Sequence, residues 1–412
     1  MNQQPIKINH NDFLNRVLTA LYEIFRVQPA DINEFKLLIL RLLLYKYLSD
    51  LSSDQNEKPR LFIPEYYRWS QLCRKAENES LNVSDNVLYE AVLEFEILYP
   101  ELVGIFTDSI SLINRLNRSY LHSILNLIGS IDFNIFTENS SQFEIATYIF
   151  EWFAKNDGKG GGEYITPYGV AELIARVATH NHNELIDAYD PACGSAGLLL
   201  ALNQQRFVID GFYGQEMNQT AIALAKIRVL LSGQKIEKFV FNQDNSLESQ
   251  AYQNKKFDVV LSVPPFGIKW RPEDPEYNGP KLTRNSADFA FVWHGLKHLS
   301  EDGTMVIVLP IGSLFRGASE QKFRQYLVEE RNCIESIIAL PPNLFFSTGI
   351  PTCMLVIKKQ RQNTDKILFI DASNTCGKER WRNYLREQDI KKVLDTLQNG
   401  VQNFPGSWGK ER

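Results

Sequence analysis

The chain has 412 residues, of which 44% are hydrophobic and 23% charged, with a formal net charge of −5 at pH 7. This length favours two domains, and the composition excludes a mostly disordered protein. The acidic balance disfavours a broad nucleic-acid-binding surface of the chain's own, because such surfaces are usually basic. The most apolar run, 37–48, contains Arg41 and Lys46 and is too short to span a bilayer, so we expect a soluble protein.

Cysteine and histidine usage indicates neither disulfides nor a metal. The five cysteines have no close spacing of the kind that metal ligands need, which fits a reducing cytoplasm. The polar N-terminus, 1–11, lacks the apolar core of a signal peptide, so we expect a cytoplasmic protein. His294 and His298 share a helical spacing, but no carboxylate lies between them, and a packed or solvated helix face is the better interpretation.

The first part of the chain is predicted to be helical. Apolar residues recur every three or four positions from about 12 to 153, as in Phe13, Val17 and Leu21. We therefore expect an N-terminal helical domain over residues 1–155. Such a domain can contact DNA, dock a partner or act as a scaffold, and the periodicity does not choose among these.

A glycine-rich segment, 156–162, separates this domain from one with a different pattern. The strands expected after it are 185–189, 208–214, 238–242, 257–262, 304–309, 334–340 and 352–358. Amphipathic stretches such as 220–231 and 288–299 alternate with them. This alternation predicts an open, mostly parallel sheet covered on both faces, over a domain of residues 156–375. Residues 376–412 are expected to form a C-terminal helical tail.

The turn from Asp190 to Gly197 follows the first expected strand and opens a helix. Its small residues let the backbone approach a ligand closely, and the helix N-terminus adds partial positive charge. Glu216 ends the next strand, where a carboxylate can accept both hydroxyls of a ribose. The turn lacks the spacing of a dinucleotide fingerprint, and no P-loop lysine follows it. This pattern favours S-adenosylmethionine over nicotinamide cofactors and ATP.

The loop after the expected fourth strand reads Ser262-Val263-Pro264-Pro265-Phe266. A Pro-Pro-aromatic loop at this place is of the type that receives a flipped nucleobase. Transfer to an exocyclic adenine amine needs acceptors for its two hydrogens, from an Asn or Asp side chain and from the next proline carbonyl. Val263 stands where that Asn or Asp normally lies and has no side-chain acceptor.

Taken in order, these segments resemble the methylase (modification) subunit of type I restriction-modification systems, the adenine-specific DNA methyltransferase family. The resemblance runs from about residue 30 to about 395. Its segments are 43–50, 67–69, 162–167, 190–197, 244–247, 262–267, 286–291, 309–312, 314–317 and 340–345. It implies an α/β fold in which an N-terminal helical domain precedes a class I, Rossmann-like methyltransferase domain with a mostly parallel sheet.

By this resemblance, three parts of the chain and the acid Glu216 would hold S-adenosylmethionine. The residues are Glu163, Tyr164, Ile165, Thr166, Pro167 and Tyr168 at the methionine part, Asp190, Pro191, Gly194, Ser195, Ala196 and Gly197 in the turn, Glu216 at the ribose, and Asn245 at the adenine edge. Asp244 is an alternative to Asn245, because the match there is loose. Ala196 stands where the family often has glycine. The catalytic loop would be Val263, Pro264, Pro265 and Phe266.

Val263 leaves three interpretations open. In the first, the chain is a degenerate methylase that binds cofactor and DNA but methylates slowly or not at all. In the second, Ser262 substitutes for the missing group, and in the third, the methyl acceptor is one that needs no amine activation. Because Phe266 has little purpose without a planar substrate, we favour the first interpretation.

The resemblance also implies partners. The residues after Phe266 belong to the same expected sheet, which leaves no room for a domain that reads DNA sequence. The partners implied are double-stranded DNA, a separate specificity subunit and a restriction subunit, and no membrane. The basic and aromatic stretch 378–386 is either an amphipathic surface helix or part of such an interface. A non-catalytic DNA-binding or assembly subunit of a defence complex is the alternative function.

Overall fold

The computed structural model describes residues 10–26, 32–53, 61–78, 82–106, 118–134, 141–156, 164–180, 182, 187–249, 251–270, 279–361, 366–380, 382–399 and 409–411. The chain divides into two compact units. The first is Met1–Gly161 with Lys226–Gln234, and the second is Gly162–Ala225 with Lys235–Arg412. Most of the expected glycine-rich segment, 157–162, lies outside the described residues. No helix in the described ranges is long and apolar enough to cross a membrane.

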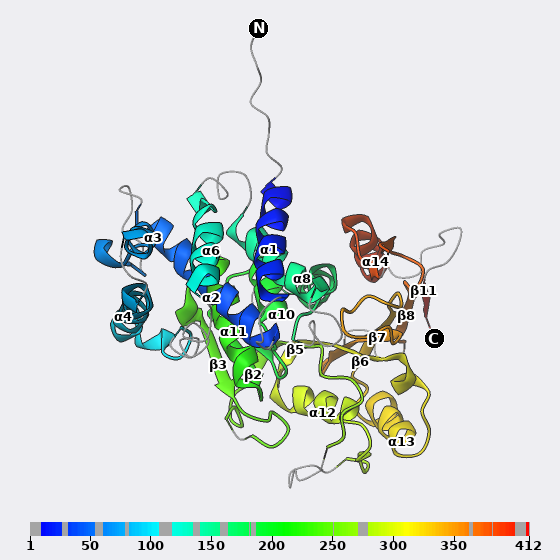
Figure 1. Ribbon diagram of the computed structural model, residues 1–412. Helices are drawn as coiled ribbons and strands as arrows, with labels where there is room; N and C mark the ends of the chain where they lie inside the picture. The colour runs from blue at the N-terminus through cyan, green and yellow to red at the C-terminus, as the bar shows by residue number, and fades with distance from the viewer. Residues whose placement is uncertain are drawn as a thin grey trace. The chain divides into compact units, whose positions relative to one another are not determined.

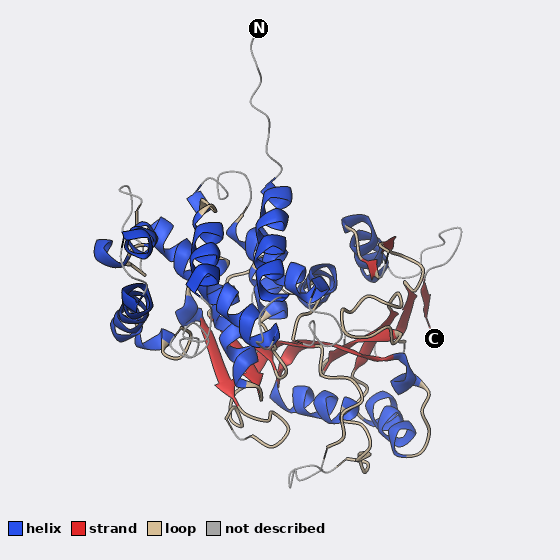
Figure 2. Cartoon of the chain, in the orientation of Figure 1, coloured by secondary structure: helices blue, strands red, loops and turns tan. Residues whose placement is uncertain are grey.

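The first unit is built from helices (Figures 1 and 2). Its α-helices are α1 (His10–Arg26), α2 (Ile32–Leu51), α3 (Trp69–Asn78), α4 (Asn82–Leu98), α6 (Arg118–Gly129) and α8 (Gln142–Asn156). Ser141 and Glu144 form a capping box at the start of α8, where each side chain accepts from the other's backbone N–H. The apolar spacing expected in α1 is confirmed by its buried face, which includes Leu14, Val17 and Leu21.

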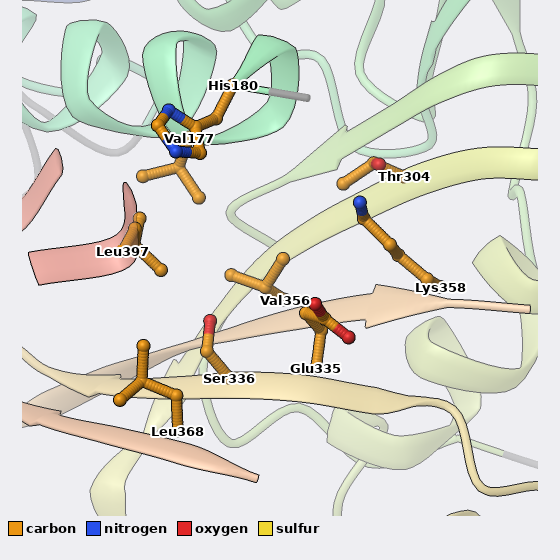
Figure 3. Close-up of a pocket in the computed structure, with 9 residues that line it drawn as sticks. All are labelled: Val177, His180, Thr304, Glu335, Ser336, Val356, Lys358, Leu368 and Leu397. Carbon is orange, nitrogen blue, oxygen red and sulfur yellow. The ribbon is translucent and has the colours of Figure 1, made fainter. Parts of the chain in front are cut away.

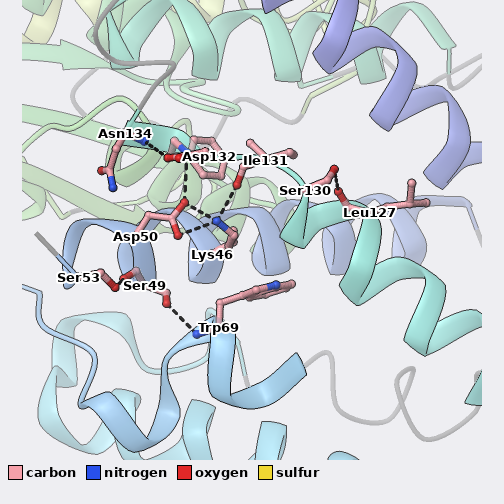
Figure 4. Close-up of polar contacts among 11 residues, drawn as sticks. Lys46, Ser49, Asp50, Ser53, Trp69, Leu127, Ser130, Ile131, Asp132 and Asn134 are labelled. Atoms are coloured by element: carbon pink, nitrogen blue, oxygen red, sulfur yellow. Dashed lines mark hydrogen bonds and ion pairs between the residues drawn. The ribbon is translucent and has the colours of Figure 1, made fainter. Parts of the chain in front are cut away.

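A buried ion pair fixes α2 to the segment that follows α6 (Figure 4). Lys46 Nζ pairs with the Asp50 carboxylate one helical turn away and donates to the Ile131 carbonyl at 2.6 Å. Asp50 also accepts from the Phe133 backbone N–H at 3.2 Å. Burial raises the pKa of Asp50, and the Lys46 charge acts against that rise. Lys46 and Asp50 of this apolar-looking helix therefore have a structural role.

The same part of α2 receives the start of α3. Ser49 Oγ accepts from the Trp69 backbone N–H at 2.8 Å, and a Cβ at Gly129 would lie 3.0 Å from Trp69 Nε1. These residues border a polar cavity of about 470 Å³ together with Lys46 and Asp50. The segments 43–50 and 67–69, noted in the sequence, thus meet in one hydrogen-bonded junction within the helical unit.

The second unit is built on a nine-stranded sheet with the order β11-β8-β6-β7-β5-β4-β1-β2-β3. The strands are β1 (Asp187–Asp190), β2 (Gly211–Glu216), β3 (Phe239–Gln243), β4 (Phe257–Ser262), β5 (Leu299–Pro310), β6 (Ile334–Ala339), β7 (Thr352–Lys358), β8 (Leu368–Asp371) and β11 (Gly409–Glu411). All described pairings are parallel except those made by β7 and β11. The mostly parallel sheet expected from the sequence is confirmed.

Helices cover this sheet. They are α9 (Tyr168–Thr179), α10 (Gly197–Asn203), α11 (Gln219–Leu231, of which Lys226–Leu231 belongs to the first unit), α12 (Asp288–His298), α13 (Ser319–Gln325) and α14 (Glu387–Asn399). Helix α12 packs on β4 and β5, and α12 and α13 lie on one side of the sheet with α10 on the other (Figure 1). The core beneath α12 is continuous apolar surface that includes Phe289, Leu296, Val260, Met305 and Leu309.

Three expectations about local structure were wrong. The second strand begins at Gly211 rather than 208, since Val208 is 78% exposed and has no partner strand at its level. The stretch 378–386 is not a helix but contributes to a short antiparallel pair, β9 (Gly377–Lys378) with β10 (Asn383–Tyr384). Accordingly, 376–412 is not a purely helical tail, because β9, β10 and β11 accompany α14. Residues 185 and 186 of the first expected strand lie outside the described ranges.

Candidate active site at the carboxyl edge of the sheet

The predicted site segments meet at one edge of the sheet. β1, β2, β3 and β4 run parallel, so the turn after β1, Glu216 at the end of β2, and the loops after β3 and β4 leave from the same side. Ligands of open α/β sheets bind at this carboxyl edge. The strand order alone therefore gathers residues that lie far apart in the sequence.

The turn after β1 has the backbone conformation that its small residues permit. Gly194 has φ +49°, and a Cβ there would lie 2.8 Å from the Tyr164 carbonyl oxygen. Ala196, with φ 60°, adopts the left-handed conformation as the residue before α10. The Cys193 N–H donates to the Gln215 carbonyl of β2 at 3.0 Å. Glycine is required at Gly194, whereas Ala196 occupies a position at which glycine would be less strained.

The segment before α9 lies on this turn. The Ser195 N–H and hydroxyl both donate to the Tyr164 carbonyl, at 3.0 and 2.9 Å, and Asn218 Nδ2 donates to the Tyr164 hydroxyl at 2.9 Å. Ile165 and Pro167 are buried, and Thr166 and Tyr168 are half-buried. The structure thus brings the segment 164–168 against the turn after β1 and against Asn218, while Glu163 lies outside the described residues.

Glu216 is oriented by the backbone around it. Its two carboxylate oxygens accept from the Gly194 N–H at 3.2 Å and from the Asn218 N–H at 2.9 Å. The side chain is half-buried, so it remains accessible. A carboxylate has about four lone-pair sites, and two are left after these bonds. That number suits the two hydroxyls of a ribose.

Asp190 is buried at the start of the turn. It is only 1% exposed, and its Oδ1 accepts from the Ala192 N–H of its own turn at 3.0 Å. Burial raises the pKa of Asp190 to about 8, and the nearby Glu216 charge adds to the rise. Asp190 therefore supports the turn from beneath. Next to it, the buried Pro191 carbonyl accepts from the Ser246 hydroxyl and ties in the loop after β3.

The loop after β3 contains both candidates for the adenine edge. The Asp244 N–H donates to the Glu216 carbonyl at 3.1 Å, and Asp244 Oδ1 accepts from the Asn245 N–H at 2.8 Å. Asn245 Oδ1 accepts from the Leu247 N–H at 3.2 Å. The amide nitrogen of Asn245 has no hydrogen-bond partner among the described residues, so it can donate to an acceptor on a ligand.

The Pro-Pro-aromatic loop presents its residues unequally. Val263 and Phe266 are half-buried, Pro264 is buried and Pro265 is exposed. Phe266 meets Phe345 edge to face, with ring centroids 5.4 Å apart and an interplanar angle of 86°. Phe345 belongs to the loop after β6 and was not expected at the site. A second Pro-Pro segment ending in aromatics, at 341–346, was the signal in the sequence that pointed to it.

Ser262 is fully buried at the end of β4. Its relative exposure is 0%, and its hydroxyl has no hydrogen-bond partner within the described residues. The residue sits in the ladder beside Ile307 of β5. A hydroxyl inside the sheet is poorly placed to meet an incoming base, so this geometry disfavours Ser262 as a substitute for the missing acceptor.

The two histidines of α12 belong to the core below the site. His294 Nε2 and Gln215 Oε1 share the Tyr189 hydroxyl, at 2.9 and 2.7 Å, and His298 Nδ1 contacts the His294 carbonyl at 2.8 Å. Burial lowers the pKa of His294 well below its ordinary value. In the described ranges, no group of three His, Cys, Asp or Glu side chains is arranged to hold a metal ion.

A second cavity lies at the opposite, amino edge of the sheet (Figure 3). It is lined by residues that include His180, Ser336, Lys358 and Leu368, and its volume is about 60 Å³. About two water molecules fill such a volume. This cavity is too small for a nucleoside cofactor.

The parallel sheet, the glycine turn after β1 and the acid that ends β2 define the class I methyltransferase fold. Residues 143–408 match the N-6 DNA Methylase family, and the chain belongs to that family. The resemblance noted in the sequence is confirmed.

Curated relatives and solved structures agree with this membership. The methylase subunit of the type I restriction enzyme MpnII from Mycoplasma pneumoniae is 34% identical over 67% of this chain and 55% of its own. The MjaVII methylase subunit from Methanocaldococcus jannaschii is 30% identical over 81% and 60%. The crystal structure of a type I restriction-modification methyltransferase subunit from Streptococcus thermophilus is 26% identical, with a TM-score of 0.78, and the match covers 97% of this chain and 95% of that one. The chain spans less than two thirds of the length of the two curated relatives.

Proposed function

We propose that this chain is the DNA methyltransferase (modification) subunit of a type I restriction-modification system, acting on the exocyclic amine of adenine. The observation that carries the proposal is the meeting of Tyr164, the turn around Gly194 and Glu216 at the edge where the Pro264–Phe266 loop leaves β4. Membership of the N-6 DNA Methylase family supports it. So does the likeness to the Streptococcus thermophilus subunit over almost the whole chain.

The residues present fit S-adenosylmethionine, which supplies an electrophilic methyl group when bound. Glu216 has two lone-pair sites left for the ribose hydroxyls. Asn245 offers its amide nitrogen to an acceptor on the adenine edge. Tyr164, Thr166 and Tyr168 would border the methionine part, and the absence of a side chain at Gly194 lets the Tyr164 carbonyl lie against the turn. Asp190 would act only through the turn that it supports.

The loop after β4 would hold the target base. Phe266 and Phe345 would stack on or border its ring, and the Pro264 carbonyl would accept one amine hydrogen. At Val263 the second acceptor is absent, so the amine is less activated than in a loop that begins with Asn or Asp. We therefore propose that this chain methylates adenine slowly. A non-catalytic, DNA-binding role in a defence complex is the second candidate function, and Val263 is the observation that favours it.

Replacing Glu216 with alanine should abolish most of the cofactor affinity. Hydrogen bonds to a charged group contribute about 1.5–3 kcal/mol each, so losing two should weaken binding by at least about 100-fold. Isothermal titration calorimetry with S-adenosylmethionine measures this directly. Glu248→Ala, which removes an exposed acid of the neighbouring loop, is the matched control and should bind as the parent does. Equal affinity in Glu216→Ala would remove this residue from the site.

Sequence-selective DNA binding should require a second protein that reads the sequence, as the specificity subunit does in type I systems. The chain's net charge of −5 gives it little affinity of its own for a polyanion. A gel-shift experiment with the chain alone should show weak binding that disappears as salt is raised, and addition of the specificity subunit should give tight, selective binding. Tight and selective binding by the isolated chain would contradict the proposed division of labour.

A further inference from the structure

The loop that follows β5 holds a large aromatic side chain in solvent. Phe315 comes directly after the short helix η5 (Ile311–Leu314) and is 73% exposed, more than any other described phenylalanine. A single exposed apolar side chain is ordinary on a protein surface. What sets Phe315 apart is the way its loop is fixed and where that loop lies.

Two buried carboxylates fix the loop. Arg316 donates from Nη2 to Asp288 and from Nε to Glu320, at 2.5 Å for the latter, and both carboxylates are less than 10% exposed. The Ile311 N–H donates to the Pro351 carbonyl at 2.9 Å. Ala318 then adopts φ 56° and ψ −125°, a conformation that side-chain-bearing residues rarely take. Hydrogen bonds and ion pairs therefore fix the backbone on both sides of Phe315, while its side chain stays exposed to solvent.

This loop stands beside the one that carries Phe266. β4 and β5 are parallel neighbours, with Ser262 opposite Ile307, so both loops leave the same edge one strand apart. Hydrogen bonds also join the two loops. Arg316 pairs with Asp288, and the N–H of the preceding residue, Ala287, donates to the Ile268 carbonyl at 2.9 Å. Any duplex that delivers a base to Phe266 would pass next to Phe315.

The charge around the two loops suits a nucleic acid. Lys269, Lys281 and Arg284 are exposed on the loop after β4, and none forms an ion pair within the described residues. The nearby acids Asp288 and Glu320 are buried and already paired with Arg316. Glu273, Asp274 and Glu276 of the same loop lie outside the described residues, and the three exposed cations of the loop can contact phosphates.

We propose that Phe315 is a wedge that enters the DNA base stack beside the target adenine and fills the space left when that base flips out. This rests on the proposed function, because it presupposes that an adenine is delivered to the edge of the sheet. Apolar side chains that enter a base step offset the loss of stacking. A rigid loop suits this role, since a flexible one would lose ordering entropy on insertion.

The test uses the chain in complex with its specificity subunit and a duplex that holds 2-aminopurine at the target adenine. Phe315→Ala should bind the duplex about tenfold more weakly and give a smaller rise in 2-aminopurine fluorescence, as expected for the loss of one aromatic–base stack. Phe315→Trp should keep both signals. Val208→Ala removes an equally exposed apolar side chain before β2, at the opposite edge of the sheet, and serves as the control.

A second duplex separates insertion from ordinary contact. With an abasic site opposite the target, flipping needs no wedge, and Phe315→Ala should recover the parent's affinity. Equal binding and fluorescence of Phe315→Ala and the parent on the paired duplex would overturn the wedge while leaving the proposed function intact. Loss of the specificity subunit from Phe315→Ala during purification would assign the ring to a protein interface instead and overturn it too. If the parent complex bound no DNA at all, the proposed function would fail together with the wedge.

Discussion

Val263→Asn should raise the rate of adenine methylation by about 10²–10³-fold, the usual effect of one preorganised hydrogen-bonding group at a reacting centre. The side chain of Val263 is half-buried on an otherwise intact loop, and asparagine is of similar size, so the change adds an acceptor without repacking. Affinities for cofactor and DNA should change much less than the rate. Single-turnover methyl transfer, with the specificity subunit present, separates rate from binding.

Three further variants test the same explanation. Val263→Asp also supplies an acceptor and should gain activity, whereas Val263→Ala changes size without adding one and should not. Ser262→Ala should leave the parent's residual rate unchanged, because Ser262 is buried in the sheet. Equal methylation by the parent and Val263→Asn, together with loss of activity in Ser262→Ala, would show that Ser262 activates the amine. No methylation by any variant would favour another acceptor or a non-catalytic subunit.

Lys46→Met should lower the free energy of unfolding by about 3–5 kcal/mol, the range for breaking a buried ion pair from one side. The substitution leaves the Asp50 carboxylate buried without its counter-charge and removes the donor to the Ile131 carbonyl. The pKa of Asp50 is already raised by burial, and loss of Lys46 should raise it further. Equilibrium urea unfolding of the full chain measures the change.

The control is an ion pair at the surface of the same unit. Lys155 lies 4.0 Å from Glu151 on α8 and its side chain is 41% exposed, so Lys155→Met should cost less than about 1 kcal/mol. The double variant Lys46→Met with Asp50→Asn keeps an acceptor for the Phe133 N–H and removes the unpaired charge. It should recover part of the lost stability. Equal losses for Lys46→Met and Lys155→Met would show that the buried pair has no special role.

Local patterns in the sequence were sufficient for much of the sheet. The strands expected at 257–262 and 352–358 are β4 and β7 with the same bounds, because both are mostly apolar and mostly buried. The glycine turn was recognisable for a similar reason, since only small residues tolerate the conformation at Gly194 and Ala196. In contrast, β8 exposes two of its four residues, and its pattern does not stand out from a loop.

The sequence by itself determined the class of the protein, the order of its candidate site segments and the presence of valine at the start of the candidate catalytic loop, because each depends on residues adjacent in the chain. Only the tertiary structure decided which of them meet. It set Phe345 against Phe266, buried Asp190 beneath its turn, and joined the loop of Phe315 to the loop of Phe266 through Arg316. These contacts depend on strand order and on loops that leave one edge together. Neither the strand order nor the shared edge of the loops can be predicted from the periodicity of residues along the chain.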